Sequence, residues 1–116
     1  MNNKTQGNIG EAKAIYYYTE MGYKISKPLF ENCPYDFIVD KDGILYKVQV
    51  KTSTQKKDNG RFTVNLRTMG GNRSGSGKSK NISAKEVDLL FVLLSDGRTF
   101  EMEVKNIDGQ TRVTVG

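Results

Sequence analysis

Apolar residues near the start of the chain recur at the spacing of a helix. These residues are Ala14, Ile15, Tyr18 and Met21. Because Gly22 suits the left-handed conformation that often ends a helix, the pattern predicts a helix over approximately Gly10 to Met21. Glu11 falls on the same apolar stripe and is therefore predicted to face the interior. A glutamate near a helix N-terminus also suits the helix dipole, so this position alone does not indicate a site.

A hairpin is predicted in the segment CPYDFIVDKDGILYKVQVKT, residues 33–52, after a short strand near Tyr23 to Ser26. The Asp-Gly pair at 42–43 is a strong signal for a two-residue turn, and such a turn places Asp36 opposite Gln49. Six apolar residues alternate onto one face of the hairpin, which is predicted to be core: Tyr35, Phe37, Val39, Tyr46, Val48 and Val50.

The other face of the predicted hairpin carries Asp36, Gln49 and Lys51. Opposed side chains on a strand pair have Cβ atoms about 5 Å apart, and diagonal ones are about 7 to 8 Å apart. The three side chains are therefore predicted to converge within reach of one small ion or phosphate. The alternative is a cross-strand ion pair between Asp36 and Lys51, which would contribute at most about 1 kcal/mol and would leave Glu11 unexplained.

The second half of the chain predicts further strands in RFTVNLR (61–67), DLLFVLL (88–94), RTFEMEV and TRVTV. The continuous apolar run of DLLFVLL is typical of a central strand. Ser83 and Glu86 fit a capping box that would start a short helix. A Gly, Ser and basic stretch around 68–82 has no apolar periodicity and is predicted to be a flexible loop. At 116 residues the chain is expected to form a single domain, 1–116.

The composition narrows the classes of protein and of chemistry. No apolar run approaches the roughly 20 residues that span a bilayer, and the N-terminus has no apolar signal segment, so no membrane association is expected. The single cysteine, Cys33, fits a reducing compartment, and a cytoplasmic protein is predicted. With 0 histidines, the commonest general base and the usual transition-metal ligand are missing. Catalysis would have to use carboxylates, lysine, tyrosine or a hard metal ion held by oxygen.

Positive charge is concentrated in one segment of the chain. The net charge is +5 overall and +8 between Lys51 and Lys85, so the remainder carries −3. A basic surface of this kind is typical of nucleic-acid binding, although a basic loop also arises for solubility alone. Seven residues are the candidate DNA contacts: Lys56, Lys57, Arg61, Arg67, Arg73, Lys78 and Lys80.

Three short motifs, in this order, resemble the core of the PD-(D/E)xK nuclease superfamily. They are GNIGE (Gly7 to Glu11), PYD (Pro34 to Asp36) and QVK (Gln49 to Lys51). The superfamily has a helix glutamate, an aspartate that opens one hairpin strand, and an acidic-x-lysine motif on the next strand. The resemblance covers residues 7–52, and it implies an α/β, restriction-endonuclease-like fold with a mixed central β-sheet flanked by helices.

The sequence departs from the superfamily pattern at Gln49, where an acidic residue is usual. Loss of a negative charge would weaken the affinity for a divalent cation, although an amide carbonyl can still bind a hard metal. A glutamine at this place is similar to what the group I intron-associated homing endonucleases of the superfamily carry. The segment from Gly22 to Thr52 resembles that subgroup as well.

The resemblance implies a metal-dependent catalytic site made of Glu11, Asp36, Gln49 and Lys51. Asp36 would be the central ligand of Mg²⁺, with Mn²⁺ able to substitute, and Gln49 and the Val50 carbonyl would complete the site. Glu11 would bind the metal through a water or hold a second ion. Lys51 would orient the attacking water, or accept its proton, and stabilise the charge of the pentavalent phosphate.

The function implied is that of a homing-type DNA endonuclease that hydrolyses both strands of a specific double-stranded site. One such active site cuts one strand, so a homodimer or homotetramer is predicted. A Holliday junction or branched-DNA resolvase of the same superfamily is the alternative, but such enzymes normally keep an acidic residue at the place of Gln49. A second alternative is a DNA-binding module without catalysis.

Overall fold

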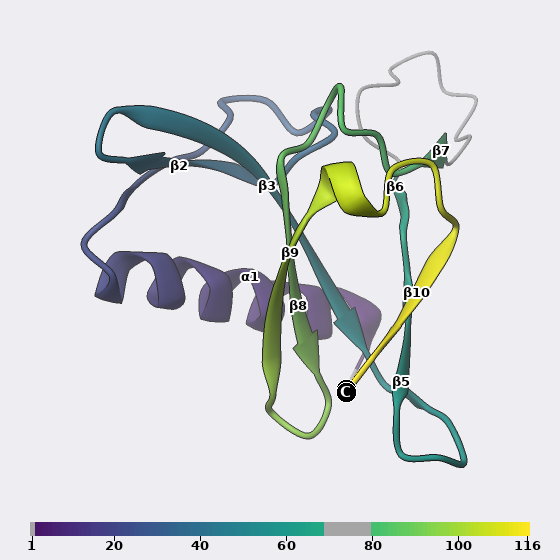
Figure 1. Cartoon of the computed structure of the whole chain (residues 1–116). Coiled ribbons are helices and arrows are strands. Elements are labelled where there is room, and N and C mark those ends of the chain that lie inside the picture. Colours follow the sequence, from purple (N-terminus) through teal and green to yellow (C-terminus); the bar gives the residue numbers. More distant parts are fainter. Residues whose placement is uncertain (1, 69–79) are drawn as a thin grey trace.

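The computed structural model describes residues 2–68 and 80–116, and its arrangement is shown in Figure 1. Its elements follow the chain in this order: α1 (Asn3–Glu20), β1 (Lys24–Ser26), β2 (Phe37–Lys41), β3 (Ile44–Ser53), β4 (Gln55–Lys56), β5 (Phe62–Asn65), β6 (Arg67–Thr68), β7 (Lys80–Asn81), β8 (Leu89–Leu94), β9 (Thr99–Glu103), the 3₁₀ turn η1 (Val104–Asn106) and β10 (Arg112–Val115). Within these two ranges, no helix has the length and apolar character needed to cross a membrane.

The helix α1 begins earlier than its apolar spacing predicts. Asn2 caps it, because the Thr5 backbone N–H donates to the Asn2 side-chain oxygen at 2.8 Å. The first two turns are polar, so their helical character left no periodic signal in the sequence. The helix ends at Glu20, and Gly22 follows with a positive φ of 86°, as predicted. Met21 lies just past this end and is half exposed, so its predicted place on the buried stripe is wrong.

The central sheet is mixed and has the order β1-β2-β3-β8-β9. The β2–β3 turn has Asp42 and Gly43 at positive φ, 53° and 92°, which is the two-residue turn that the Asp-Gly pair predicts. Its register pairs Phe37 with Val48, as predicted. β8 runs parallel to β3, and all of its residues are buried, as expected of a central strand.

Two apolar clusters lie on the two faces of this sheet. On one face, α1 packs its buried Ala14 and Tyr18 against Phe37, Val39 and other residues of the sheet. On the other face, the side chains of β8 pack against a second sheet, β10-β5-β4. Figure 1 shows α1 crossing behind the central strands and β5 and β10 side by side at the other edge of the molecule. In the described residues, this second sheet covers the face where a further helix could have been expected.

Two features of the predicted fold are corrected. The segment Ser83 to Glu86 forms a turn and not a helix, because the Asp88 N–H bonds to the Lys47 carbonyl and leads the chain directly into β8. Tyr35 packs with the second cluster and not with α1, since β2 begins only at Phe37.

The stretch predicted as a loop around 68–82 is partly structured at its ends. β6 and β7 pair Thr68 with Lys80, and Ile82 is buried in the second cluster. Arg73 and Lys78, two of the predicted DNA contacts, lie outside the described residues.

A tyrosine and a lysine fix the helix on the sheet. The Tyr18 hydroxyl donates to a Glu101 carboxylate oxygen at 2.5 Å, which joins α1 to β9. Burial, followed by this hydrogen bond, raises the pKa of Tyr18 well above its usual range. The Lys41 ammonium lies 5.2 to 5.9 Å from the ring centroids of Tyr18, Tyr23 and Tyr46. These contacts hold α1 at a defined angle, and thereby the position of Glu11.

Candidate active site

Asp36 lies where β2 and β3 separate. Its backbone N–H donates at 2.8 Å to the carbonyl of Val48, which already pairs with Phe37, so the regular ladder ends at Phe37 and does not place Asp36 opposite Gln49 as predicted. Its side-chain oxygen accepts the Val50 backbone N–H at 2.7 Å. Because β2 begins one residue later, at Phe37, the Asp36 carboxylate takes the place of a backbone partner for β3. The aspartate is thereby fixed at the mouth of the hairpin by Val50, the neighbour of its predicted partner Gln49.

Charge and burial act on Asp36 in opposite directions. Burial raises its pKa most strongly, and the Val50 N–H lowers it. Glu11 then raises the pKa further, while Lys51 and Lys27 lower it. Asp36 is thus a half-buried carboxyl group that interacts electrostatically with another carboxylate and with two ammonium groups.

Gln49 and Lys51 project from the face of β3 that is turned away from α1. They pair with Leu90 and Val92 of β8, whose side chains belong to the second cluster. Lys51 donates from Nζ to the Arg67 backbone carbonyl, and the Gln49 side-chain amide donates to the Val50 carbonyl at 3.3 Å. Burial lowers the pKa of Lys51, and the charge of Asp36 opposes this effect. The structure therefore brings Lys51 to Asp36, whereas the Gln49 amide is held at the Val50 carbonyl.

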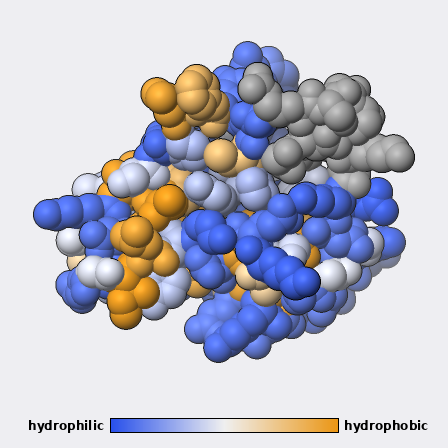
Figure 2. Space-filling model, turned by 90° about the horizontal axis from the view of Figure 1, so that it is seen from above, coloured by the Kyte–Doolittle hydropathy of each residue, from blue (hydrophilic) through white to orange (hydrophobic). Residues whose placement is uncertain are grey.

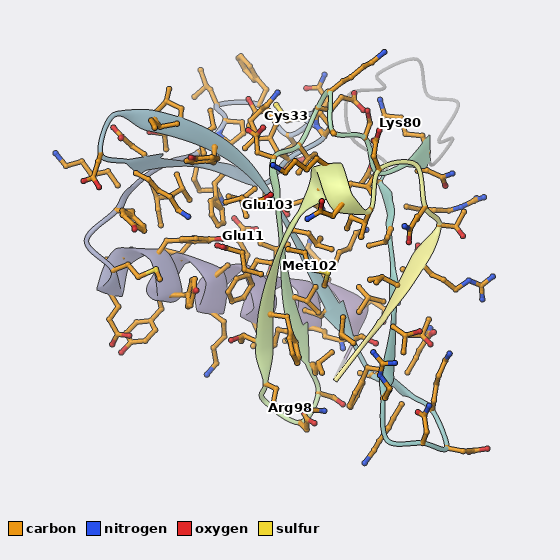
Figure 3. The ribbon with its side chains drawn as sticks, viewed as in Figure 1. Glu11, Cys33, Lys80, Arg98, Met102 and Glu103 are labelled. Carbon is orange, nitrogen blue, oxygen red and sulfur yellow. The ribbon has the colours of Figure 1, made fainter. Side chains whose placement is uncertain are left out.

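Glu11 reaches the same place from the opposite face of the sheet. Figure 3 shows its side chain directed from α1 toward the strands. Its carboxylate is paired with the Lys27 ammonium, and a quarter of the side chain is exposed. Because β2 has not yet begun at this level, the gap beside β3 lets Glu11 and Asp36 interact across the sheet. Glu11 thus faces the sheet, as predicted, and interacts there with Asp36, although its side chain is not fully buried.

Gly10 allows α1 to approach β3 closely. A Cβ atom at this position would lie 2.5 Å from Thr52 Cγ2 and 3.3 Å from Val50 Cγ1. A carbon–carbon contact of 2.5 Å does not occur in real structures, so a side chain at this position would force Thr52 or the helix to move. The close approach brings the next residue, Glu11, to the level of Asp36.

The oxygen atoms at this place suit a divalent cation. Asp36 and Glu11 are carboxylates whose mutual repulsion raises the pKa of Asp36, and a cation between them would relieve that repulsion. The Gln49 amide oxygen and the Val50 carbonyl are the further oxygen donors nearby. In residues 2–68 and 80–116, no three Asp, Glu, Cys or His residues form a cluster that could hold a metal. A cation held here would have two carboxylates, an amide oxygen and a backbone carbonyl as its possible ligands.

Two hollows meet at these residues. The smaller one, of about 270 Å³, is lined by Glu11, Asp36, Lys27, Phe30 and others from the loop before β2. The larger one, of about 710 Å³, contains Lys51 together with mostly polar residues of the α1 N-terminus and of the segment from β3 to β6: Asn3, Gln6, Gly7, Val50, Thr52, Ser53, Thr54, Gln55, Thr63, Asn65 and Arg67. The two hollows share no lining residue, but Asp36 of the smaller one accepts the N–H of Val50 of the larger one.

The predicted DNA contacts are divided between two regions. Lys57 and Arg61 lie at the β4–β5 turn, where both side chains reach Thr114 of β10. Lys56 is nearby on β4, and its charge acts on Asp96. Arg67 lines the larger hollow beside Lys51. Lys80 forms an ion pair with Glu86 at 2.6 Å, and it lies on β7 beside the strand of Arg67, at the upper right of Figure 3.

Sequence reasoning missed Lys27 and Gly10. Lys27 stands in a segment with no periodicity or motif, so only the folded chain reveals its pairing with Glu11. Gly10 is the predicted helix start and part of the GNIGE motif, but its contact with Thr52 is a tertiary one that no local pattern predicts. The polar face of β5 did have a signal, since Thr63 and Asn65 alternate with buried apolar residues.

Comparisons with known proteins agree with this geometry. A family model described as PD-(D/E)XK endonuclease matches residues 1–114. Protein 5.3 of Escherichia phage T7 is 35% identical over 110 residues, which cover 95% of this chain and 87% of that protein. The solved structure of a bacterial homing endonuclease, I-Ssp6803I, is similar with a TM-score of 0.82 and 25% identity, over 100% of this chain and 79% of that one.

Proposed function

The chain belongs to the PD-(D/E)XK endonuclease family, as its motifs predict, and from this premise we propose that it is a divalent-metal-dependent endonuclease that cuts double-stranded DNA at a specific site. The similarity to a homing endonuclease over the whole of this chain supports the homing-type assignment. The observation that carries the proposal is the setting of Asp36, a half-buried carboxyl group between the charges of Glu11 and Lys51.

The residues of the site have distinct parts in the proposed reaction. Asp36, Gln49, the Val50 carbonyl and Glu11 would hold Mg²⁺ or Mn²⁺, which supplies an activated water and neutralises charge on the phosphate. Lys51 in its charged form stabilises the developing negative charge on the phosphate oxygens. Its lowered pKa also increases the neutral fraction, which can accept a proton from the attacking water. The Lys27 ammonium holds the Glu11 carboxylate toward the site.

The larger hollow supports the assignment of DNA as substrate. It is polar, it contains Lys51 and Arg67, and no acidic residue of the described chain lines it. A phosphate backbone entering this hollow would meet positive charge beside the proposed reaction centre. Because one such centre cuts one strand, cleavage of both strands requires a homodimer or homotetramer.

The first test compares three DNA substrates. Supercoiled plasmid, a library of linear duplexes with randomised sequence, and a four-way junction are each incubated with the protein in Mg²⁺ or in EDTA. We expect cleavage of the plasmid and of a subset of the duplexes in Mg²⁺, and no cleavage in EDTA. Gel electrophoresis of the products and sequencing of the cut ends measure both the activity and its site preference.

The other outcomes separate the alternatives. Cleavage of the junction alone would assign the chain to the branched-DNA resolvases. Tight binding of all three substrates with no cleavage in Mg²⁺ or Mn²⁺ would leave a DNA-binding module and contradict the endonuclease proposal.

A second prediction concerns Gln49. In the Gln49→Glu variant, a carboxylate joins the proposed cation ligands, so half-maximal cleavage is expected at a lower Mg²⁺ concentration. The measurement is the cleavage rate as a function of Mg²⁺ concentration. Gln110→Glu is the matched control, because Gln110 is exposed in the turn before β10 and the same charge is added away from Asp36. An unchanged Mg²⁺ dependence for Gln49→Glu would remove Gln49 from the ligand set.

A further inference from the structure

The outer face of the sheet β10-β5-β4 is polar along all three strands. Cross-strand pairing places Gln55 opposite Thr63, Thr63 opposite Thr114, and Asn65 opposite Arg112. The opposite face of the same sheet carries Phe62 and Val64, which are buried in the second cluster. The outer face therefore presents amide, hydroxyl and guanidinium groups from neighbouring strands.

This face is hollowed and is continuous with the proposed reaction centre. A hollow of about 370 Å³ is lined by Gln55, Thr63, Asn65, Arg67, Thr111 and Arg112. The first four of these residues also line the 710 Å³ hollow that contains Lys51. A ligand that lies across β5 would thus extend, without interruption, to the neighbourhood of Asp36.

The charge of the face is one-sided. Neither hollow has an acidic side chain among the described residues that line it. A face that is polar only for solubility usually mixes charges of both signs, and the chain has 13 acidic residues available for this. Figure 2, which is coloured by hydropathy, shows mostly hydrophilic surface over the half of the molecule that carries β5 and β10.

The side chains on this face are those that distinguish base pairs. The amides of asparagine and glutamine can form two hydrogen bonds with adenine, and arginine can do so with guanine, in the major groove of DNA. That groove is about 12 Å wide and admits a two-stranded ribbon such as β5 with β10. Gln55, Asn65 and Arg112 stand on three neighbouring strands, which suits contacts with successive base pairs.

We propose that the outer face of β10-β5-β4 enters the major groove beside the cleaved phosphate and reads base edges through Gln55, Asn65 and Arg112. This inference rests on the proposed function, because it assigns sequence recognition to a surface next to the same site. It differs from the predicted lysine and arginine contacts, which act on phosphates and carry no sequence information.

The local role of Asn65 decides which variant is informative. Its side-chain oxygen accepts the Arg67 backbone N–H at 2.8 Å, so this oxygen also supports the local fold. Asn65→Ser keeps an oxygen that can accept the same N–H, because serine forms similar turns, but it removes the amide. Gln55→Ala removes an exposed amide at the end of the sheet. Asn106→Ala is the matched control, because Asn106 is an exposed asparagine of η1 that lines neither hollow.

The experiment is cleavage of the randomised duplex library in Mg²⁺, followed by sequencing of the cut ends. For Gln55→Ala and for Asn65→Ser we expect loss of base preference at one or two positions on the same side of the cut, by about 5- to 100-fold at each position. The measured quantity is the base preference among the cut products of each variant, normalised to the total cleavage by that variant. Asn106→Ala should reproduce the wild-type preference at all positions.

Two results would overturn the inference. If both variants keep the full wild-type base preference, the face does not read bases. If they lose cleavage of all sequences equally, the face contacts only the backbone or serves the fold, and circular dichroism separates these two cases. A wild-type protein that cuts no library member fails at an earlier step, and contradicts the proposed function itself.

Discussion

Replacing Asp36 by asparagine is expected to remove DNA cleavage and, at neutral pH, to raise the stability of the fold. Asparagine can still accept the Val50 N–H, so the hairpin mouth should keep its geometry. The variant lacks the negative charge that the proposed cation needs, and a loss of at least about 10²- to 10³-fold in cleavage rate is expected for removal of such a group. DNA binding should persist, since one negative charge has been removed from the path of the phosphates.

The stability gain follows from the pKa of Asp36. Because burial raises this pKa, the folded state binds the proton more tightly than the unfolded chain does. The resulting contribution to stability is fully present below about pH 4 and is lost as the pH rises through the raised pKa. Asparagine does not titrate, so the Tm of Asp36→Asn should exceed that of the wild type at pH 7 and approach it at low pH. A gain of about 1 kcal/mol would raise Tm by roughly 4 °C in a domain of this size.

Thermal unfolding in EDTA between pH 4 and pH 8 tests the predicted gain in stability. Plasmid cleavage in Mg²⁺ tests the predicted loss of activity. Asp96→Asn is the matched control, because Asp96 has a lowered pKa, owing first to its hydrogen bond with the Arg98 N–H. A carboxyl group with a lowered pKa stabilises the fold at neutral pH, and this stabilisation is lost as the pH falls. Asp96→Asn should therefore not raise Tm at pH 7, and it should leave cleavage intact. An Asp36→Asn variant that cuts DNA at the wild-type rate would contradict the proposed role of Asp36.

Replacing Gly10 by alanine is expected to destabilise the protein and to slow cleavage together. The added Cβ would collide with Thr52 Cγ2, so α1 would have to move away from β3 and carry Glu11 with it. Overpacking of this kind costs about 1 to 3 kcal/mol. The better helix propensity of alanine offsets up to about 1 kcal/mol of this cost. Urea denaturation measures the stability. The rate of plasmid cleavage in Mg²⁺ tests whether Glu11 keeps its place in the site.

Two further variants separate this contact from a general effect on the helix. Gly7→Ala is the control, because a Cβ at Gly7 meets nothing within 4 Å, and it should be neutral or stabilise by up to about 1 kcal/mol. Thr52→Ser removes Cγ2, so the Gly10→Ala/Thr52→Ser double variant should recover much of the lost stability and activity. Equal stability of Gly10→Ala and Gly7→Ala would show that the close approach is not required.

The local features of this fold were predictable from the sequence. The Asp-Gly turn set the register of β2 and β3 and placed Asp36 beside the segment from Gln49 to Lys51. The continuous apolar run of β8 identified the central strand. These predictions succeeded because turn conformation and strand alternation depend on residues that are adjacent in the chain. The Ser83–Glu86 prediction failed because a hydrogen bond from Asp88 to the distant Lys47 competes with the local helix signal.

The sequence by itself determined the hairpin and the central strand, and it predicted the four polar residues of the proposed site. Only the tertiary structure decided how these residues meet. It directs Lys51 to the Arg67 carbonyl, pairs Glu11 with Lys27, and makes Gly10 the point of closest approach between α1 and β3. It also turns Gln55, Asn65 and Arg112 onto one face next to the site. The physical reason is that these contacts join residues far apart in the chain, so they depend on how whole layers pack and leave no signal in local spacing.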